Sequence, residues 1–82
     1  MQMQNVVEAV GPRGCLVLRA ADGSYVLAQQ IDAKPLRVAQ VLCGALDTIG
    51  IDSATDPDTG ANYDFFIEAY GLSREAALGA VA

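Results

Sequence analysis

The amino-acid sequence predicts an α+β domain in which a small three-stranded antiparallel meander is followed by two or three helices. Three observations support this prediction. The Asp22-Gly23 pair separates two apolar runs, as in a β-hairpin. Apolar residues recur at helical spacing over residues 35–49. Helix start and stop signals then follow in residues 63–82.

The length of 82 residues predicts a single small domain with a thin core. We expect it to divide into a β-meander (1–31), a helix (35–49), an acidic turn-rich loop (50–62) and short C-terminal helices (63–82).

The hairpin is expected to turn on Asp22-Gly23, because a two-residue turn needs positive φ at both central positions. Such a turn pairs Leu18 with Leu27. Residues 5–10, which precede the hairpin, are predicted to form the remaining strand of the meander. Residues 11–14, with one proline and two glycines, are predicted to connect it to the hairpin.

The 35–49 helix is predicted to begin at Pro35, which suits the first helical position, and to stop at Gly50. Its apolar residues extend beyond one stripe, so we expect packing on two sides or against another chain.

The C-terminal part is predicted to be helical after the 50–62 loop. Asn62 is expected to cap a short helix from Tyr63 to Tyr70, which ends at Gly71. Ser73 is expected to cap a last helix.

Localisation is predicted from the termini, the cysteines and hydropathy. No run approaches the roughly 20 apolar residues of a membrane span. The first residues lack the basic start and apolar core of a secretory signal, so we expect a cytoplasmic protein with no membrane contact. Cys15 and Cys43 are then expected to be reduced.

Catalysis and metal or cofactor binding are not predicted. The chain has no histidine, no activated cysteine motif and no phosphate-binding loop. The run from Asp56 to Asp64 alternates oxygen side chains, as calcium loops do. It has Ala61 where an EF-hand needs glycine and Ile67 where it needs glutamate, so a turn is the preferred interpretation.

Residues 71–77 (Gly-Leu-Ser-Arg-Glu-Ala-Ala) resemble the turn and second-helix start of bacterial helix-turn-helix proteins. This resemblance implies DNA binding, which we keep only as a second alternative. Residues 47–82 carry seven acids and one base, a charge that would repel the duplex, so no direct nucleic-acid binding is expected.

Surplus apolar residues indicate self-association, for which a symmetric homodimer is the commonest solution. They lie on the second face of the hairpin and on the 35–49 helix. The expected self-association residues are Val17, Val26, Ala28, Val38 and Val41.

Charge is divided unevenly along the chain. Residues 1–46 are near neutral at net +1, whereas residues 47–82 carry net −6. We therefore expect a non-enzymatic protein-interaction module with a basic partner. The expected partner-binding residues are Asp52, Asp56, Asp58, Asp64, Glu68, Tyr63 and Tyr70.

Besides DNA binding, two other interpretations of the acidic residues stay open. In size and charge the chain resembles acidic inhibitors that phages and mobile elements encode, of anti-CRISPR or anti-restriction type. Such inhibitors occupy the nucleic-acid site of a basic protein. The other is that the acids only keep an apolar-rich domain soluble.

Overall fold

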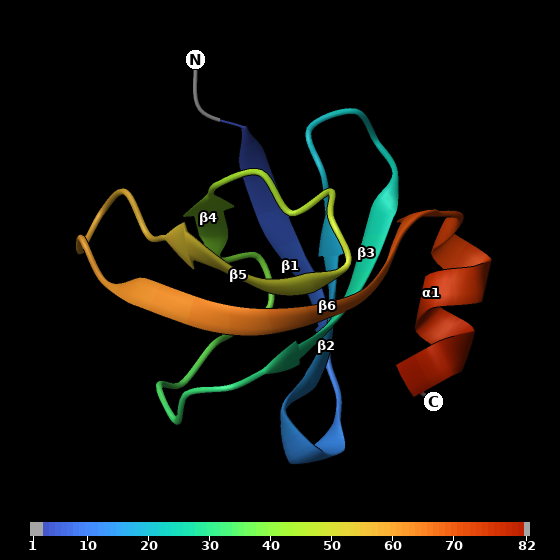
Figure 1. Cartoon of the computed structure of the whole chain (residues 1–82), viewed down its shortest axis with the longest axis horizontal. Coiled ribbons are helices and arrows are strands. Elements are labelled where there is room, and N and C mark those ends of the chain that lie inside the picture. The colour runs from blue at the N-terminus through green and yellow to red at the C-terminus, as the bar shows by residue number, and fades with distance from the viewer. Residues whose placement is uncertain (1–2, 82) are drawn as a thin grey trace.

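The computed structural model describes residues 3–81, which form a closed six-stranded antiparallel β-barrel with one α-helix beside it (Figure 1). The expected α+β class, a three-stranded meander followed by two or three helices, is therefore wrong. The elements are β1 (Gln4–Val10), a 3-10 turn (Pro12–Gly14), β2 (Cys15–Arg19), β3 (Tyr25–Gln30), β4 (Val41–Cys43), β5 (Gly50–Thr55), β6 (Asn62–Leu72) and α1 (Arg74–Val81).

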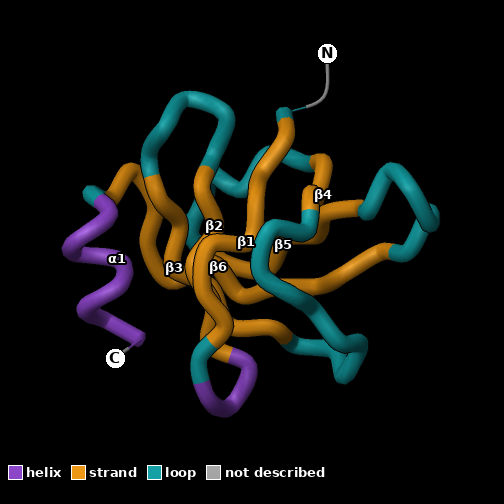
Figure 2. The backbone as a smooth tube through the Cα atoms, turned by 180° about the vertical axis from the view of Figure 1, so that it is seen from behind, coloured by secondary structure: helices purple, strands orange, loops and turns teal. Residues whose placement is uncertain are grey.

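The barrel consists of two three-stranded meanders, and the strand order around it is β1-β2-β3-β6-β5-β4. The first meander, β1-β2-β3, is antiparallel as predicted. Residues 31–40 then cross one end of the barrel and place β4 beside β1, which makes a Greek key of the first four strands. Figure 2 shows this closure from behind, with α1 outside the barrel wall.

The β2–β3 hairpin turns over three residues instead of two. Gly23 N donates to Ala20 O at 3.0 Å, and Ala20 N donates to Ser24 O at 2.8 Å. Gly23 has φ +87°, so the turn is the three-residue type that ends in a left-handed glycine. Leu18 consequently pairs with Val26 and not with Leu27, and the predicted register is wrong by one residue.

Residues 35–49 do not form the predicted helix. They contain the end of the crossover, the short strand β4 and the loop before β5. Ala39 has φ +76° and Gly44 has φ +155°, and neither value fits a right-handed helix. The backbone approaches closely at Gly44, where an added Cβ would lie 2.9 Å from Ser53 O.

Residues 62–72 form the longest strand, β6, and not a helix capped by Asn62. Tyr63, Phe65 and Ile67 face the core, while the residues between them face outward. This alternation has the period of a half-buried strand. The preceding segment, expected as a loop over 50–62, contains β5 and a turn, and only the turn part of that prediction is confirmed.

The core fills the barrel interior with apolar side chains from all six strands. Its largest fully buried members include Phe65, Leu16, Leu18, Leu42, Ile67, Val7 and Val26. Outside the barrel, α1 packs on β2 and β3. There Val17 and Ala77 are fully buried although they lie outside the central cluster, so the helix covers part of the apolar outer wall.

The last helix begins as predicted, because Ser73 Oγ accepts a hydrogen bond from Ala76 N at 3.2 Å. Gly71 and Leu72, however, end a strand, so α1 is not the second helix of a helix-turn-helix pair. In the stretch 3–81, no helix combines the length and the apolar character required to traverse a membrane.

Candidate functional site

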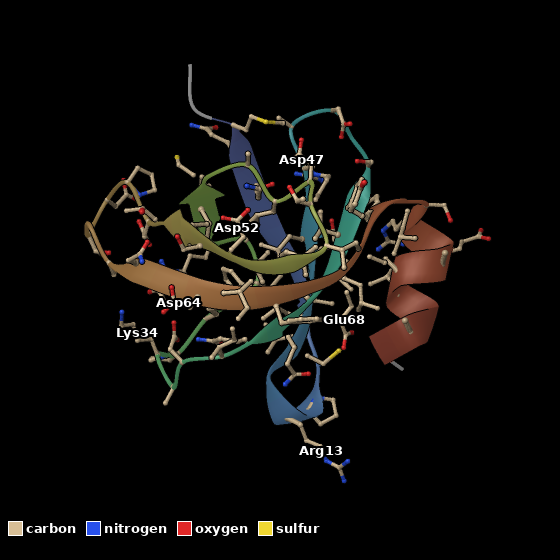
Figure 3. All side chains as sticks on the ribbon, in the orientation of Figure 1. Arg13, Lys34, Asp47, Asp52, Asp64 and Glu68 are labelled. Atoms are coloured by element: carbon tan, nitrogen blue, oxygen red, sulfur yellow. The ribbon has the colours of Figure 1, made fainter. Side chains whose placement is uncertain are left out.

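The outer surface of β6 and its two neighbours carries exposed apolar residues with acids beside them. We call this surface the β6 face and define it by Ile31, Ile51, Asp64, Phe66 and Glu68. Ile51 comes from β5, the next three from β6, and Ile31 follows the end of β3. Figure 3 shows Asp64 and Glu68 along the long front strand.

Strand register places the apolar residues of this face side by side. Ile51 lies directly opposite Phe66 on the β5–β6 ladder. Ile31 N donates to Asp64 O at 2.9 Å, which extends the β3–β6 ladder by one residue. Ile51 is 77% exposed and Phe66 42% exposed, so this pair contributes little to the core and much to the surface. Exposed apolar neighbours of this kind are typical of binding surfaces.

The acids of the β6 face are not neutralised within the described part of the chain. The one salt bridge found there joins Arg19 to Glu8 at 3.7 Å, away from this face. Lys34 lies near Asp64 in Figure 3, but its Nζ donates to Asn62 O and lies 5.7 Å from the ring centre of Tyr63. Asp64 and Glu68 therefore present negative charge to solvent.

The other predicted partner-binding acids are placed elsewhere. Asp58 is exposed at the tip of the β5–β6 hairpin. Asp52 is half-buried on β5, and its Oδ1 accepts a hydrogen bond from Ser53 N at 2.8 Å. Asp56 is buried. The structure therefore brings only Asp64 and Glu68 together on one exposed strand face.

Asp56 belongs to a structural network. Its Oδ1 accepts from Asp58 N, and its Oδ2 accepts from Gln40 Nε2 at 2.9 Å. These hydrogen bonds hold the pKa of the Asp56 carboxyl below its ordinary value. Gln40 also donates to the Tyr63 hydroxyl at 3.2 Å, so the network ties the crossover to the β5–β6 hairpin.

The two tyrosines that were expected to bind a partner have different surroundings. Tyr63 is buried in the barrel and satisfied by Gln40, so it is not exposed for a partner. Tyr70 is half exposed at one open end of the barrel. The exposed aromatic ring on the β6 face is that of Phe66.

The expected self-association residues are also divided. Val26 and Ala28 are buried in the core, and Val17 is buried in the wall that α1 covers. None of these three can contribute to an interface of the folded chain. Val38 is exposed on the crossover, and Val41 is half-buried on β4 opposite Val6.

Both cysteines are free thiols. Burial raises the pKa of Cys15, and the nearby negative charge of Glu68 raises it further, so the thiol form is favoured at neutral pH. Over residues 3–81, no three side chains of the histidine, cysteine, aspartate and glutamate types gather as a metal site would require.

The sequence-based interpretation missed Ile31, Ile51 and Phe66 as surface residues. A detectable signal lay in residues 62–70, where apolar and polar side chains largely alternate with the period of a strand. Phe66 interrupts this alternation, because it is an apolar residue on the otherwise polar side of the strand. An exposed apolar residue at this position indicates the β6 face. Comparison with protein-family models, with curated proteins and with solved structures finds no match to this chain.

Proposed function

We propose that this chain is a non-enzymatic interaction module that binds a basic protein partner through the β6 face. The observation that carries the proposal is the exposed Ile51–Phe66 pair beside the carboxylates of Asp64 and Glu68, which form no salt bridge among residues 3–81. An apolar centre with a charged rim is the usual arrangement of a protein interface. The acids would steer a basic partner and the apolar pair would be buried against it.

A second copy of the chain is a less suitable occupant of the same face. A two-fold interface centred on this surface would bring Asp64 and Glu68 of one copy against the same acids of the other. The chain also carries a net charge of −5, which opposes self-association in general. A homodimer through Val38 and Val41 stays a separate prediction.

The inhibitor alternative is a narrower form of the same proposal, in which the basic partner is a nucleic-acid-binding protein and the acids occupy its phosphate sites. We expect the protein to act in the cytoplasm, since Cys15 and Cys43 are unpaired thiols. The proposed binding needs no catalytic residue, metal or cofactor.

Affinity capture with charge-reversed variants tests the proposal. The double variant Asp64→Lys and Glu68→Lys removes the acids of the β6 face. The matched control is Asp58→Lys and Glu75→Lys, which makes the same change in net charge at exposed positions on the hairpin tip and on α1. Each protein is immobilised and exposed to a lysate of the source cells, and captured proteins are identified by mass spectrometry.

We expect wild type and control to retain a basic protein, with an isoelectric point above about 9, that the β6-face variant loses. Retention should also fall as salt rises, because exposed charges are screened. Equal loss in both variants would show that only net charge matters, and equal retention would show that the β6 face is not used. Either result contradicts the proposal.

A further inference from the structure

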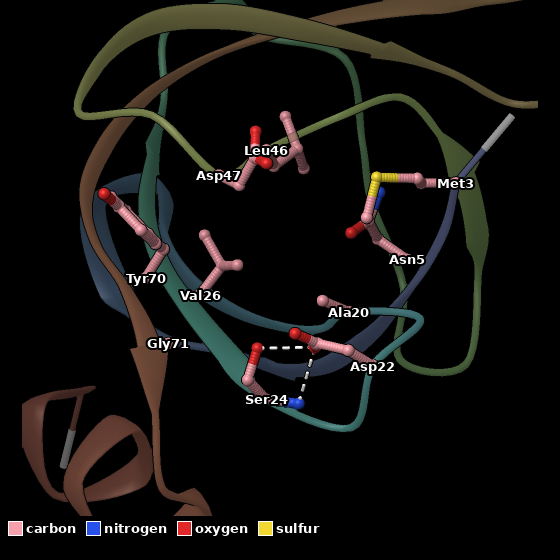
Figure 4. A pocket seen from close by; sticks show the side chains of 10 residues that line it. All are labelled: Met3, Asn5, Ala20, Asp22, Ser24, Val26, Leu46, Asp47, Tyr70 and Gly71. Carbon is pink, nitrogen blue, oxygen red and sulfur yellow. Dashed lines mark hydrogen bonds between the residues drawn. The ribbon is translucent and has the colours of Figure 1, made fainter.

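The open end of the barrel opposite the crossover holds a pocket of about 260 Å³. It lies between the start of β1, the β2–β3 turn, the loop before β5 and the end of β6. Figure 4 shows the lining side chains arranged around an open centre. Val26, Leu46 and Ala20 supply apolar walls. The pocket is separate from the β6 face, because none of the residues that define that face lines it.

Asn5 gives this pocket a fixed hydrogen-bond acceptor. The side chain is 1% exposed and sits at an interior position of β1, where a barrel normally has an apolar residue. Its Nδ2 donates to Leu42 O at 3.2 Å and to Gly44 O at 2.8 Å. Because carbonyl oxygens only accept, these two bonds fix the orientation of the amide.

The Oδ1 oxygen of Asn5 is consequently directed into the pocket, as Figure 4 shows. The two side-chain hydrogen bonds of Asn5 found among residues 3–81 are both donated by Nδ2, and neither involves Oδ1. The Asn5 side chain as a whole is 1% exposed, but no polar side-chain atom of residues 3–81 is both fully buried and without a hydrogen-bond partner. Oδ1 is therefore reached from the pocket and can accept a hydrogen bond from an N–H group that a ligand brings.

The charged groups that line the pocket are carboxylates, which only accept hydrogen bonds. Asp22 and Asp47 contribute the carboxylates, Ser24 and Tyr70 also line the pocket, and no lysine or arginine of the described residues does. Ser24 donates to Asp22 through its hydroxyl at 2.6 Å and its amide at 2.9 Å. Those bonds lower the pKa of Asp22, which keeps its carboxylate negative near neutral pH.

We propose that this pocket binds a small organic cation, namely a primary ammonium group on a short apolar or aromatic body. The ammonium donates to Asn5 Oδ1 and is attracted by the carboxylates of Asp22 and Asp47, while the body contacts Val26 and Leu46. At roughly 30 Å³ for each water-sized group, the volume suits a ligand of about nine non-hydrogen atoms. The site is independent of the β6 face and its partner.

Three compounds that share a benzyl group test this proposal on the full chain. 2-Phenylethylamine is the cationic probe, 2-phenylethanol its neutral analogue and phenylacetate an anionic one. Binding is followed by amide NMR, in which the side-chain NH₂ resonances of Asn5 report directly on the pocket. We expect the amine to shift these resonances and those of Leu46 and Asp47 in a saturable way. The alcohol should bind about tenfold more weakly, and phenylacetate should not bind.

A matched pair of variants tests whether amine binding depends on a carboxylate in the pocket or only on the net charge of the protein. Asp47→Asn is isosteric and exposed, so the barrel should stay folded, and we expect it to weaken amine binding about tenfold. Asp58→Asn makes the same charge change away from the pocket and should leave binding unchanged. Equal affinity for amine and alcohol, no saturable shift up to about 10 mM amine, or equal loss in both variants would each overturn the proposal.

Discussion

The carboxylate of Asp32 accepts a hydrogen bond from the backbone amide of Asp64, with 2.7 Å between Oδ2 and N. Asp32 stands at the start of the β3–β4 crossover, and Asp64 lies on β6, so this bond holds the crossover against the strand that carries the β6 face. Gln30 Nε2 and Lys34 N donate to the other oxygen of Asp32. One side chain therefore orders the whole beginning of the crossover.

These contacts make stability depend on pH. Partial burial alone would raise the pKa of Asp32, but the hydrogen bonds from Asp64, Gln30 and Lys34 outweigh it, and the pKa lies below the ordinary value of 3.8. A carboxyl with a depressed folded-state pKa stabilises the fold above its unfolded-state pKa. That contribution is lost as the pH falls through the folded-state value.

We expect Asp32→Asn to reduce the free energy of unfolding by about 1 kcal/mol at pH 7. The difference from wild type should shrink in acid well below the ordinary aspartate pKa of 3.8, where wild type also loses the charge as the pH falls through its depressed folded-state pKa. Urea unfolding at the two pH values measures both effects. Asp58→Asn, at an exposed carboxylate, is the control and should show no such difference at pH 7. A pH-independent gap for Asp32→Asn would contradict this explanation.

Truncation of the two neighbouring phenylalanines of β6 should have costs of very different size. Phe65 is fully buried in the barrel, and we expect Phe65→Ala to cost about 3–5 kcal/mol in the free energy of unfolding. Phe66 is largely at the surface, and Phe66→Ala should cost less than about 1 kcal/mol. Chemical unfolding of the two variants checks this difference. Similar costs for both would mean that residues 62–72 do not alternate as a strand.

Two glycines should also differ in the sign of their effect. At Gly44, with φ +155°, an added Cβ would meet the backbone of Ser53 and Ala54, so Gly44→Ala should destabilise by roughly 1–3 kcal/mol. Gly79 lies in α1 with open space around it, and Gly79→Ala should stabilise by up to about 1 kcal/mol. Thermal melts test the pair. Stabilisation by Gly44→Ala would indicate that the helix first expected there does form.

The elements predicted correctly are those with strong local signals. The strand at residues 25–30 is bounded by turn residues on one side, and the helix after Ser73 has a polar cap. The hairpin was located correctly but its register was not, because Asp-Gly suits both two-residue and three-residue turns. The choice between them depends on how the hairpin fits into the barrel.

The two wrong helices have different causes. In residues 35–49, apolar residues fall at helical spacing by coincidence, and tertiary contacts decide the outcome. Val7 N donates to Gln40 O and Ala39 N donates to Val7 O, which attaches this segment to β1. Residues 63–70 carry both helix-capping signals and the period of a strand, and in the structure they form part of the strand β6. Closure of the barrel depends on pairing between strands that are far apart in the chain. The local patterns of a single sequence do not reveal this pairing.

The candidate site was predicted in part. The acids are concentrated in residues 47–82 of the sequence, and the structure places Asp64 and Glu68 on one exposed face, where partner binding stays a prediction. The sequence does not show that Asp56 differs from these exposed acids. Asp56 is buried and accepts hydrogen bonds from Gln40 and the Asp58 amide. The apolar centre of the face depends on the pairing of Ile51 with Phe66, and it becomes visible only with the register of the barrel.

Site-specific photo-crosslinking tests the proposed function most directly. A benzophenone amino acid is placed at Phe66, on the β6 face, and in a second protein at Val10, which is 47% exposed on β1, opposite β6 in the strand order. We predict that the position-66 probe crosslinks to a basic protein, and that this product disappears when Asp64→Lys and Glu68→Lys are added. Equal crosslinking from both positions, or crosslinking at position 66 to a second copy of this chain, would contradict the proposal.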